Sequence, residues 1–300
     1  MRSRRRSPLH AEAADQGCVQ GSAGHKTGVV IPVHDVNPLR RTPIVTIALV
    51  VANIVVFLLT LGPQSGDTAA GQLCRQAEFY DHYAAIPREM IDNQPLRRVP
   101  TGDVGAVGGN EVSCETARPS YHKIPALSVL SAMFLHGGWL HLLGNMLFLW
   151  IFGNNVEDRF GRIRYLLFYL LCGYVAAYGF ALADPDSTTP LIGASGAIAG
   201  VLGAYIVLFP RARVWSLVPV LFFIPLRLPA WLVLGLWFVL QWFYSAGHAV
   251  SAAGGVAYLA HVVGFVTGML LALVIRATTR GPVNTWGRRP PPPSYPGRWR

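Results

Sequence analysis

Long stretches without a charged residue constrain this chain more than any other feature of its sequence. A helix needs about 20 mainly apolar residues to cross the roughly 30 Å hydrocarbon core of a bilayer. Six stretches approach that length and are expected to form membrane-spanning helices: 44–62, about 139–153, about 165–183, 191–209, about 229–246 and about 256–275. The sequence therefore predicts an all-α membrane protein, a bundle of six transmembrane helices.

The composition favours lipid over nucleic acid as the surroundings of the chain. Only 13% of the residues are charged, against about a quarter in soluble proteins, and 52% are hydrophobic. The net charge of +10 is not gathered on one helix face, since the basic residues lie mainly at the two ends and in short connections. We therefore expect contact with the lipid bilayer and no nucleic-acid partner.

The same basic residues predict the direction of the helices, because short loops rich in Arg and Lys lie on the cytoplasmic side. The segments rich in Arg and Lys are 1–43, 154–164, 210–228 and the tail from 276, which hold seven, three, three and six of these residues, respectively. The connections between them, 184–190 and 247–255, hold none. Both termini are therefore predicted to be cytoplasmic.

The chain divides by composition into a membrane domain and two tails. The domain is predicted over 43–276, between cytoplasmic segments over 1–42 and 277–300 that are expected to be disordered because they are rich in Arg, Gly, Pro and Ser. Within the domain, a long non-cytoplasmic loop over 63–123 contains two cysteines.

The cysteines show no C-x-x-C spacing, so they do not indicate a metal or redox site. Cys74 and Cys114 lie in the 63–123 loop, where a disulfide can persist outside the cytoplasm. The sequence leaves paired and unpaired thiols equally open.

Polar side chains within the predicted spans mark the candidate site, because such residues are costly in lipid and face the interior of a bundle. With a cytoplasmic N-terminus, the second, fourth and sixth helices all enter from the non-cytoplasmic side. Their first turns hold His141 and Asn145, Ser195, and His261, respectively. These four side chains are therefore expected in one shallow layer.

Glycines recur at helical spacing in two of these spans, at Gly196, Gly200 and Gly203 in the fourth and at Gly264 and Gly268 in the sixth. Such faces allow helices to approach closely in lipid. Ser195 adjoins the first face, and His261 lies one turn outward on the second. Packing of the two faces would bring Ser195 and His261 within reach, as a nucleophile and its base require.

The second helix offers hydrogen-bond donors at the same level. His141 and Asn145 stand at i and i+4, so both project from one side of that helix. Together with the backbone N–H of Ser195, they are predicted to stabilise a developing oxyanion. Gly193, two residues before the serine, lets the backbone approach a substrate closely.

Three segments resemble the signature regions of the rhomboid intramembrane serine proteases: HGGWLHLLGNMLFLWIFGNNVEDRFG (136–161), GASGAIAGVLGAY (193–205) and AHVVGFVTG (260–268). The resemblance covers about 43–276. It implies a serine endopeptidase that needs no cofactor or metal, with single-span or other transmembrane proteins as substrates, cleaved in or near their transmembrane segments.

The resemblance also implies a role for each polar residue of the layer. It makes Ser195 the nucleophile and His261 the general base of a dyad without an acidic third member, with His141 and Asn145 near the oxyanion. One departure is Leu127-Ser128, where family members often carry Trp-Arg before the second helix, so altered loop packing is expected. The excess of arginine over lysine, 23 to 2, favours a bacterial source, and a bacterial plasma membrane is predicted.

Two other classes of protein fit part of this pattern. A non-catalytic rhomboid-like protein that binds membrane helices is the first, although such relatives typically lack the serine or the histidine, and this chain has both. A transporter or haem protein is the second, since histidines in a bundle can carry protons or ligate iron. His141 and His261 have no second pair deeper in their helices, which favours hydrolysis. His136 and His248 are interpreted as solvated or loop-packing residues.

Overall fold

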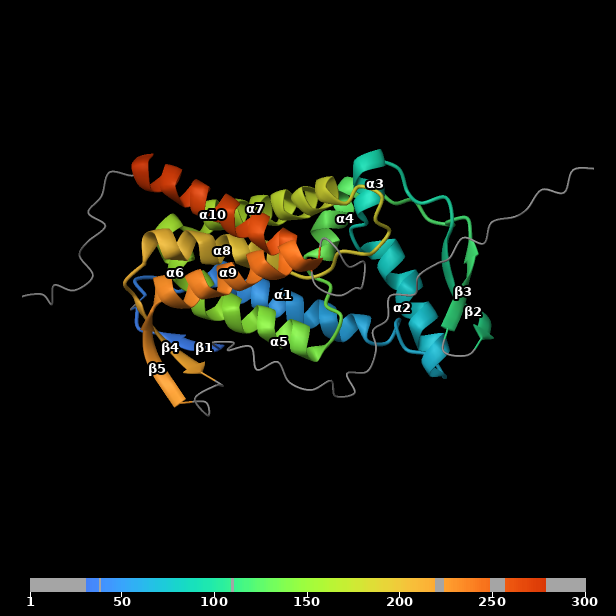
Figure 1. The fold of residues 1–300 in the computed structure, drawn as a ribbon, viewed down its shortest axis with the longest axis horizontal. Helices are drawn as coiled ribbons and strands as arrows, with labels where there is room; N and C mark the ends of the chain where they lie inside the picture. The colour runs from blue at the N-terminus through green and yellow to red at the C-terminus, as the bar shows by residue number, and fades with distance from the viewer. Residues whose placement is uncertain (1–30, 38, 109–110, 219–223, 249–256, 279–300) are drawn as a thin grey trace, which may run out of the picture.

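The structure of the protein is a computed structural model that describes residues 31–37, 39–108, 111–218, 224–248 and 257–278. It is mostly helical, and its long helices lie side by side along the longest axis (Figure 1). The helices that fall on the six predicted spans are α1 (Ile44–Thr60), α5 (Trp139–Phe148), α7 (Arg162–Ala183), α8 (Ser195–Leu208), α9 (Ala230–His248) and α10 (Tyr258–Thr278).

The second span is longer than its apolar run predicts. After α5 the chain continues as a π-helical turn, η1 (Leu149–Gly153), and then as α6 (Asn154–Phe160). The helix continues past the end of the uncharged run because the charge of Glu157 is buried and has hydrogen-bond partners. Its carboxylate accepts hydrogen bonds from the backbone N–H groups of Val45 (3.0 Å) and Thr46 (2.7 Å). These are N–H groups at the start of α1, which have no acceptor inside their own helix.

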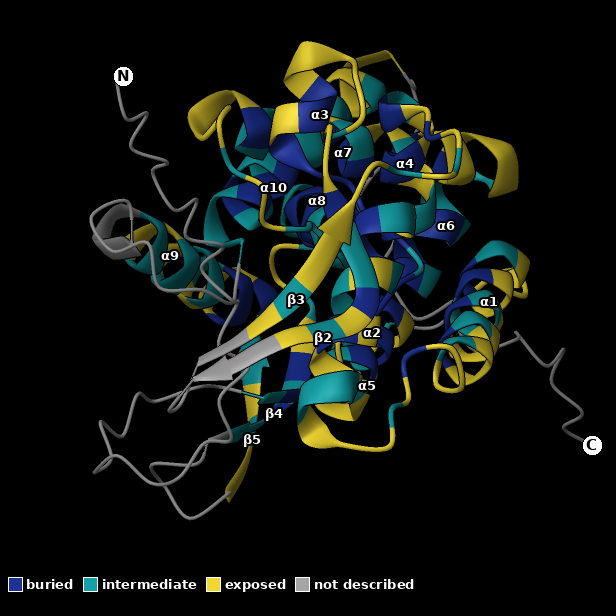
Figure 2. Ribbon diagram, turned by 90° about the vertical axis from the view of Figure 1, so that its right-hand side faces the viewer, coloured by how far each residue is buried: buried dark blue, intermediate teal, exposed yellow. Residues whose placement is uncertain are grey.

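Helix α8 occupies the centre of the bundle, where α10 and α7 pack against it (Figures 1 and 2). Glycines permit this close contact. A Cβ added to Gly264 would lie 2.2 Å from the carbonyl oxygen of Gly196, and one added to Gly268 would lie 1.9 Å from that of Gly200. The two glycine faces therefore pack backbone to backbone, which no larger residue allows.

Two small antiparallel sheets show that the prediction of an all-α fold was wrong in part. Strands β1 (Ile31–Asp35), β4 (Arg213–Val218) and β5 (Ile224–Pro229) form a sheet in the order β1-β4-β5 at one end of the bundle, and β2 (Val99–Gly108) pairs with β3 (Glu111–Ala117) at the other (Figure 1). The β1–β4 pairing joins segments far apart in the sequence, so no local sequence pattern predicts it.

Strand β1 also corrects the prediction of disorder over 1–42. Asp35, its last residue, is buried and accepts hydrogen bonds from the Tyr205 hydroxyl (2.8 Å) and from Nδ2 of Asn155 (2.6 Å). Residues 31–35 are thus fixed to the helical bundle, through α6 and α8. Residues 1–30 and 279–300 of the predicted tails lie outside the described residues.

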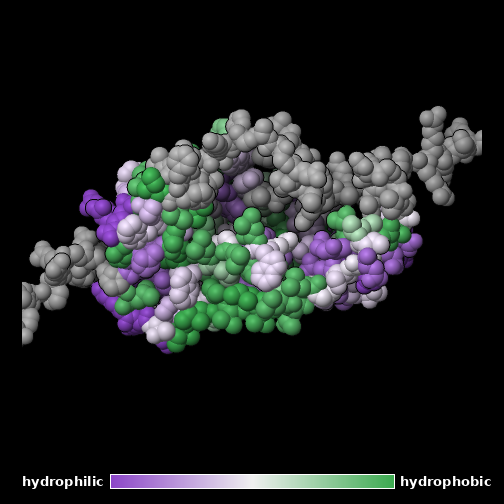
Figure 3. All heavy atoms as spheres, turned by 90° about the horizontal axis from the view of Figure 1, so that it is seen from below, coloured by the Kyte–Doolittle hydropathy of each residue, from purple (hydrophilic) through white to green (hydrophobic). Residues whose placement is uncertain are grey.

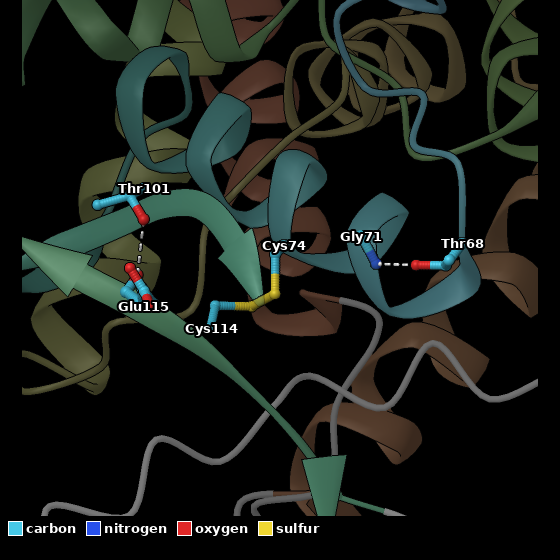
Figure 4. Close-up of a disulfide and its surroundings, with 6 residues drawn as sticks. All are labelled: Thr68, Gly71, Cys74, Thr101, Cys114 and Glu115. Carbon is cyan, nitrogen blue, oxygen red and sulfur yellow. Dashed lines mark hydrogen bonds between the residues drawn. A yellow bond between two sulfur atoms is a disulfide. The ribbon is translucent and has the colours of Figure 1, made fainter. Parts of the chain in front are cut away.

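The predicted 63–123 loop contains regular structure of its own. It holds α2 (Ala69–Tyr83), α3 (Pro87–Asp92), β2 and β3, and it leads into α4 (Pro125–Ala132). A disulfide between Cys74 on α2 and Cys114 on β3 joins the two elements, with Cα atoms 5.4 Å apart (Figure 4). The Thr68 hydroxyl accepts from the Gly71 N–H at 3.0 Å and caps α2.

A buried group of charges joins α2 and α3 to the segment just before α4. Lys123 Nζ lies 2.7 Å from Glu89 Oε2, and both side chains are almost fully buried. Lys123 also donates to the backbone carbonyl of Asp81. Burial raises the pKa of the Asp81 carboxyl to about 6, and Glu89 adds to this, whereas Lys123 and the Tyr121 hydroxyl oppose it.

The Asp81→Asn protein is expected to gain stability relative to wild type as the pH rises. Over the range from about 4 to 6, native Asp81 keeps its proton while the unfolded chain releases it, so the wild type loses stability as the pH rises. We expect the unfolding free energy of the Asp81→Asn protein, minus that of wild type, to rise by about 1–3 kcal/mol between about pH 4 and pH 7. Thermal denaturation of both proteins in detergent across this pH range measures the difference in stability. A difference that does not change with pH would contradict the prediction.

Hydrophobic side chains cover the outside of the bundle. Figure 3 shows them in the central part of one face, with hydrophilic residues toward both ends. Strongly exposed examples are Leu59, Leu140, Ile163, Phe243 and Val274. By length and composition, α7 and α10 suffice to cross a membrane, whereas α1, α8 and α9 are apolar but shorter.

Candidate active site

Ser195 and His261 meet where α8 and α10 begin. Ser195 is the first residue of α8, and His261 lies in the first turn of α10. His261 Nε2 is 2.8 Å from Ser195 Oγ, a hydrogen-bond distance. The backbone contact between the glycine faces sets this distance, because it holds the two helix axes close together.

The segment before Ser195 is not helical, which corrects the predicted helix start at 191. Leu191 exchanges two backbone hydrogen bonds with Ala85, so the 63–123 region directly supports the chain that leads to the serine. Gly193 has φ +111° and donates its N–H to the Ala132 carbonyl at 2.9 Å. Ser195 therefore lies at the N-terminus of α8, where backbone N–H groups lack helical acceptors and the helix dipole is positive.

His141 and Asn145 on α5 face the same place. A Cβ added to Gly193 would lie 2.7 Å from His141 Nε2 and 3.7 Å from Asn145 Nδ2, so both nitrogens lie beside the backbone that precedes the serine. The Gly137 N–H donates to His141 Nδ1 at 3.4 Å, which leaves the proton of a neutral ring on Nε2. Asn145 is buried, and its Nδ2 makes no hydrogen bond within the part of the chain that the structure describes. Two donors thus point to the site.

Gln241 is a member of this arrangement that our sequence analysis missed. It lies on α9, and its Oε1 is 2.8 Å from His261 Nδ1, the ring nitrogen that does not face Ser195. The signal was present in the sequence, because Gln241 is an amide within an otherwise apolar span. Polar residues in such spans usually have a partner on another helix.

The structure tests the prediction for one of the two histidines assigned to loops, His136, and not for the other, His248. His136 is buried rather than solvated, with its ring centroid 5.0 Å from that of His141, and burial lowers its pKa to about 4. Nothing is described of the His248 side chain. Within the described residues, no cluster of three or more His, Cys, Asp or Glu side chains is suited to a metal ion.

In this bundle of apolar helices, a buried helix begins with a serine that is hydrogen-bonded to a histidine. This arrangement defines a class of protein, and comparison with known sequences identifies the family. Residues 125–278 match the Rhomboid domain. The chain belongs to the rhomboid family and is a membrane protein.

Individual relatives agree with this assignment. The chain is 30% identical over 227 residues to RHOMBOID-like protein 4 of Arabidopsis thaliana, which covers 75% of this chain and 51% of the relative. It is 31% identical over 149 residues to the mitochondrial Rhomboid protein 1 of Saccharomyces cerevisiae, which covers 48% of this chain and 40% of the relative. The match to the chloroplastic Rhomboid-like protein 11 of Arabidopsis is 30% over 166 residues, which covers 52% of this chain and 55% of the relative. The chain thus spans about half the length of these relatives.

Proposed function

We propose that this protein is an intramembrane serine endopeptidase that hydrolyses peptide bonds in or near the transmembrane segments of other membrane proteins. The observation that carries the proposal is the 2.8 Å contact between Ser195 Oγ and His261 Nε2 at the start of a buried helix. Membership in the rhomboid family, which includes serine proteases, supports it. Membrane proteins are the general class of substrate.

The proposed reaction follows from the positions of the two side chains. Ser195 Oγ attacks the carbonyl carbon of the substrate as His261 Nε2 takes the hydroxyl proton. The tetrahedral intermediate then collapses with cleavage of the C–N bond, and His261 returns the proton to the leaving amine. Water attacks the acyl-enzyme by the same route, which releases the second product and the free serine.

The negative oxygen of the intermediate needs donors already in place. In the proposed reaction, the donors are the N–H groups at the start of α8, His141 Nε2 and Asn145 Nδ2, which has no hydrogen-bond partner among the described residues. Donors fixed by folding need no reorganisation at the moment of reaction, and in enzymes this kind of stabilisation usually contributes most to the rate.

Six spans with both termini in the cytoplasm form part of the proposal. The disulfide between Cys74 and Cys114 supports it, because disulfides persist outside the cytoplasm, where the 63–123 region is predicted to lie. A bacterial plasma membrane is proposed from the arginine-rich composition alone, because the relatives named above come from a plant and a yeast.

The proposal is tested with purified protein in liposomes that also contain a single-span reporter protein. We expect two fragments whose new ends lie in or next to the transmembrane segment. A panel of reporters that binds the folded protein but stays intact would favour a non-catalytic protein that binds membrane helices. Haem absorbance in the purified sample would instead support the haem alternative.

Loss of one donor is expected to slow catalysis without unfolding the protein. In the Asn145→Ala and Asn145→Leu proteins, kcat should fall by about 10²–10³-fold, because neither side chain donates a hydrogen bond to the oxyanion. The leucine variant keeps the approximate shape of the side chain and adds no charge, so it separates the donor from the packing. Cleavage rates and melting temperatures of the three proteins test this, and a leucine variant with wild-type kcat would exclude Asn145 from the reaction.

A further inference from the structure

His261 is held from two sides by groups on different helices. Its Nε2 faces Ser195 Oγ at 2.8 Å, and its Nδ1 faces Gln241 Oε1 at 2.8 Å. Trp237, one turn before Gln241 on α9, has its ring centroid 6.0 Å from that of His261. One side of α9 therefore contacts the ring of the histidine on α10.

The oxygen of an amide accepts hydrogen bonds and cannot donate them. The nitrogen that it faces, Nδ1, must therefore carry the proton, and in a neutral imidazole the other nitrogen is then free of one. Nε2 is thus left with a lone pair directed at Ser195. The opposite tautomer would present an N–H group to the serine, which cannot take a proton from it.

We propose that Gln241 is a positioning residue: it selects the tautomer of His261 that acts as a base and fixes the plane of its ring. This inference rests on the proposed function and adds a neutral third member to the Ser–His pair. A neutral acceptor suits this depth, because a carboxylate within an apolar span is costly. The amide supplies the orienting hydrogen bond without that charge.

Two substitutions separate orientation from packing. Gln241→Met keeps the length of the side chain and removes the acceptor, so kcat should fall by about 10–100-fold with KM changed less than about twofold. Gln241→Glu keeps the acceptor and should retain kcat within about tenfold of wild type. Its charge stabilises the protonated ring, so the acidic limb of the pH–rate profile should move upward by about one pH unit.

A matched control uses the same substitution elsewhere. Gln64 donates to the Thr60 carbonyl at 2.9 Å, and neither residue belongs to the candidate site. Gln64→Met should therefore keep the wild-type kcat and pH profile. The inference is overturned if Gln241→Met retains kcat, or if Gln241→Glu loses as much activity as Gln241→Met and its pH profile does not move.

The tautomer of His261 can also be measured without any substrate. Nitrogen NMR of histidine-labelled protein, with the His261 signals assigned by their loss in His261→Ala, should show a protonated Nδ1 in wild type and a loss of that preference in Gln241→Met. A wild type that cleaves no reporter contradicts the proposed function, and this measurement still decides the role of Gln241. An Nε2–H signal in wild type would overturn the inference.

Discussion

Ser195→Ala protein is expected to cleave a single-span reporter at least about 10⁴-fold more slowly than wild type, with its fold intact. The substitution removes the oxygen that attacks the carbonyl and leaves the backbone donors of α8 in place. The Ser195 side chain is partly exposed and makes its one described hydrogen bond to His261, so its loss costs little packing. Fragment yield over time, in liposomes, measures the effect.

His261→Ala should lose a comparable factor, because the two residues act as one unit and their effects do not add. The double variant therefore serves as the control, and it should be no slower than either single variant. Cleavage by Ser195→Ala at a rate near that of wild type, at the same bond, would show that another group carries out the reaction.

Among alanine substitutions at the described glycines, Gly268→Ala is expected to have the largest effect on stability. The added Cβ would lie 1.9 Å from the Gly200 carbonyl oxygen and 2.5 Å from the Gly200 Cα, both backbone atoms that cannot turn aside. Helices α8 and α10 must then separate, which should cost about 3 kcal/mol of unfolding free energy. Cleavage should fall as well, because the same separation moves His261 away from Ser195.

Gly144→Ala is the matched control for this prediction. Gly144 lies in α5, and a Cβ added there meets no atom within 4 Å. Alanine should stabilise the helix by about 0.5–1 kcal/mol relative to glycine. Opposite shifts of the melting temperature in the two variants are expected, and equal shifts would contradict the backbone contact between α8 and α10.

The sequence was informative about the site because the relevant signals are local. Ser195, His261, His141 and Asn145 are polar residues near the ends of apolar runs, and the predicted direction of the spans puts them at one level. Glycine spacing then indicated which helices touch, and the structure packs these two faces together. The spans themselves corresponded to helices in every case, with ends displaced by a few residues.

The remaining features depend on contacts between distant segments. Strand β1 pairs with β4, and Leu191 pairs with Ala85, and neither partner is visible in the local pattern. Gln241 was missed because a single amide in an apolar helix gains meaning only from the residue opposite it, here His261. Helix α6 was missed because its buried Glu157 resembles a loop charge until its partners at the start of α1 are known.

The central claim is that the contact between α8 and α10 makes Ser195 a nucleophile, and a fluorophosphonate tests it most directly. Wild-type protein and the His261→Ala variant are treated in liposomes, and the adduct is located by mass spectrometry. The account predicts one modified serine, Ser195, in wild type and almost none in the variant, because His261 must take the hydroxyl proton. Folded wild-type protein without an adduct at Ser195, or equal modification of both proteins, would contradict it.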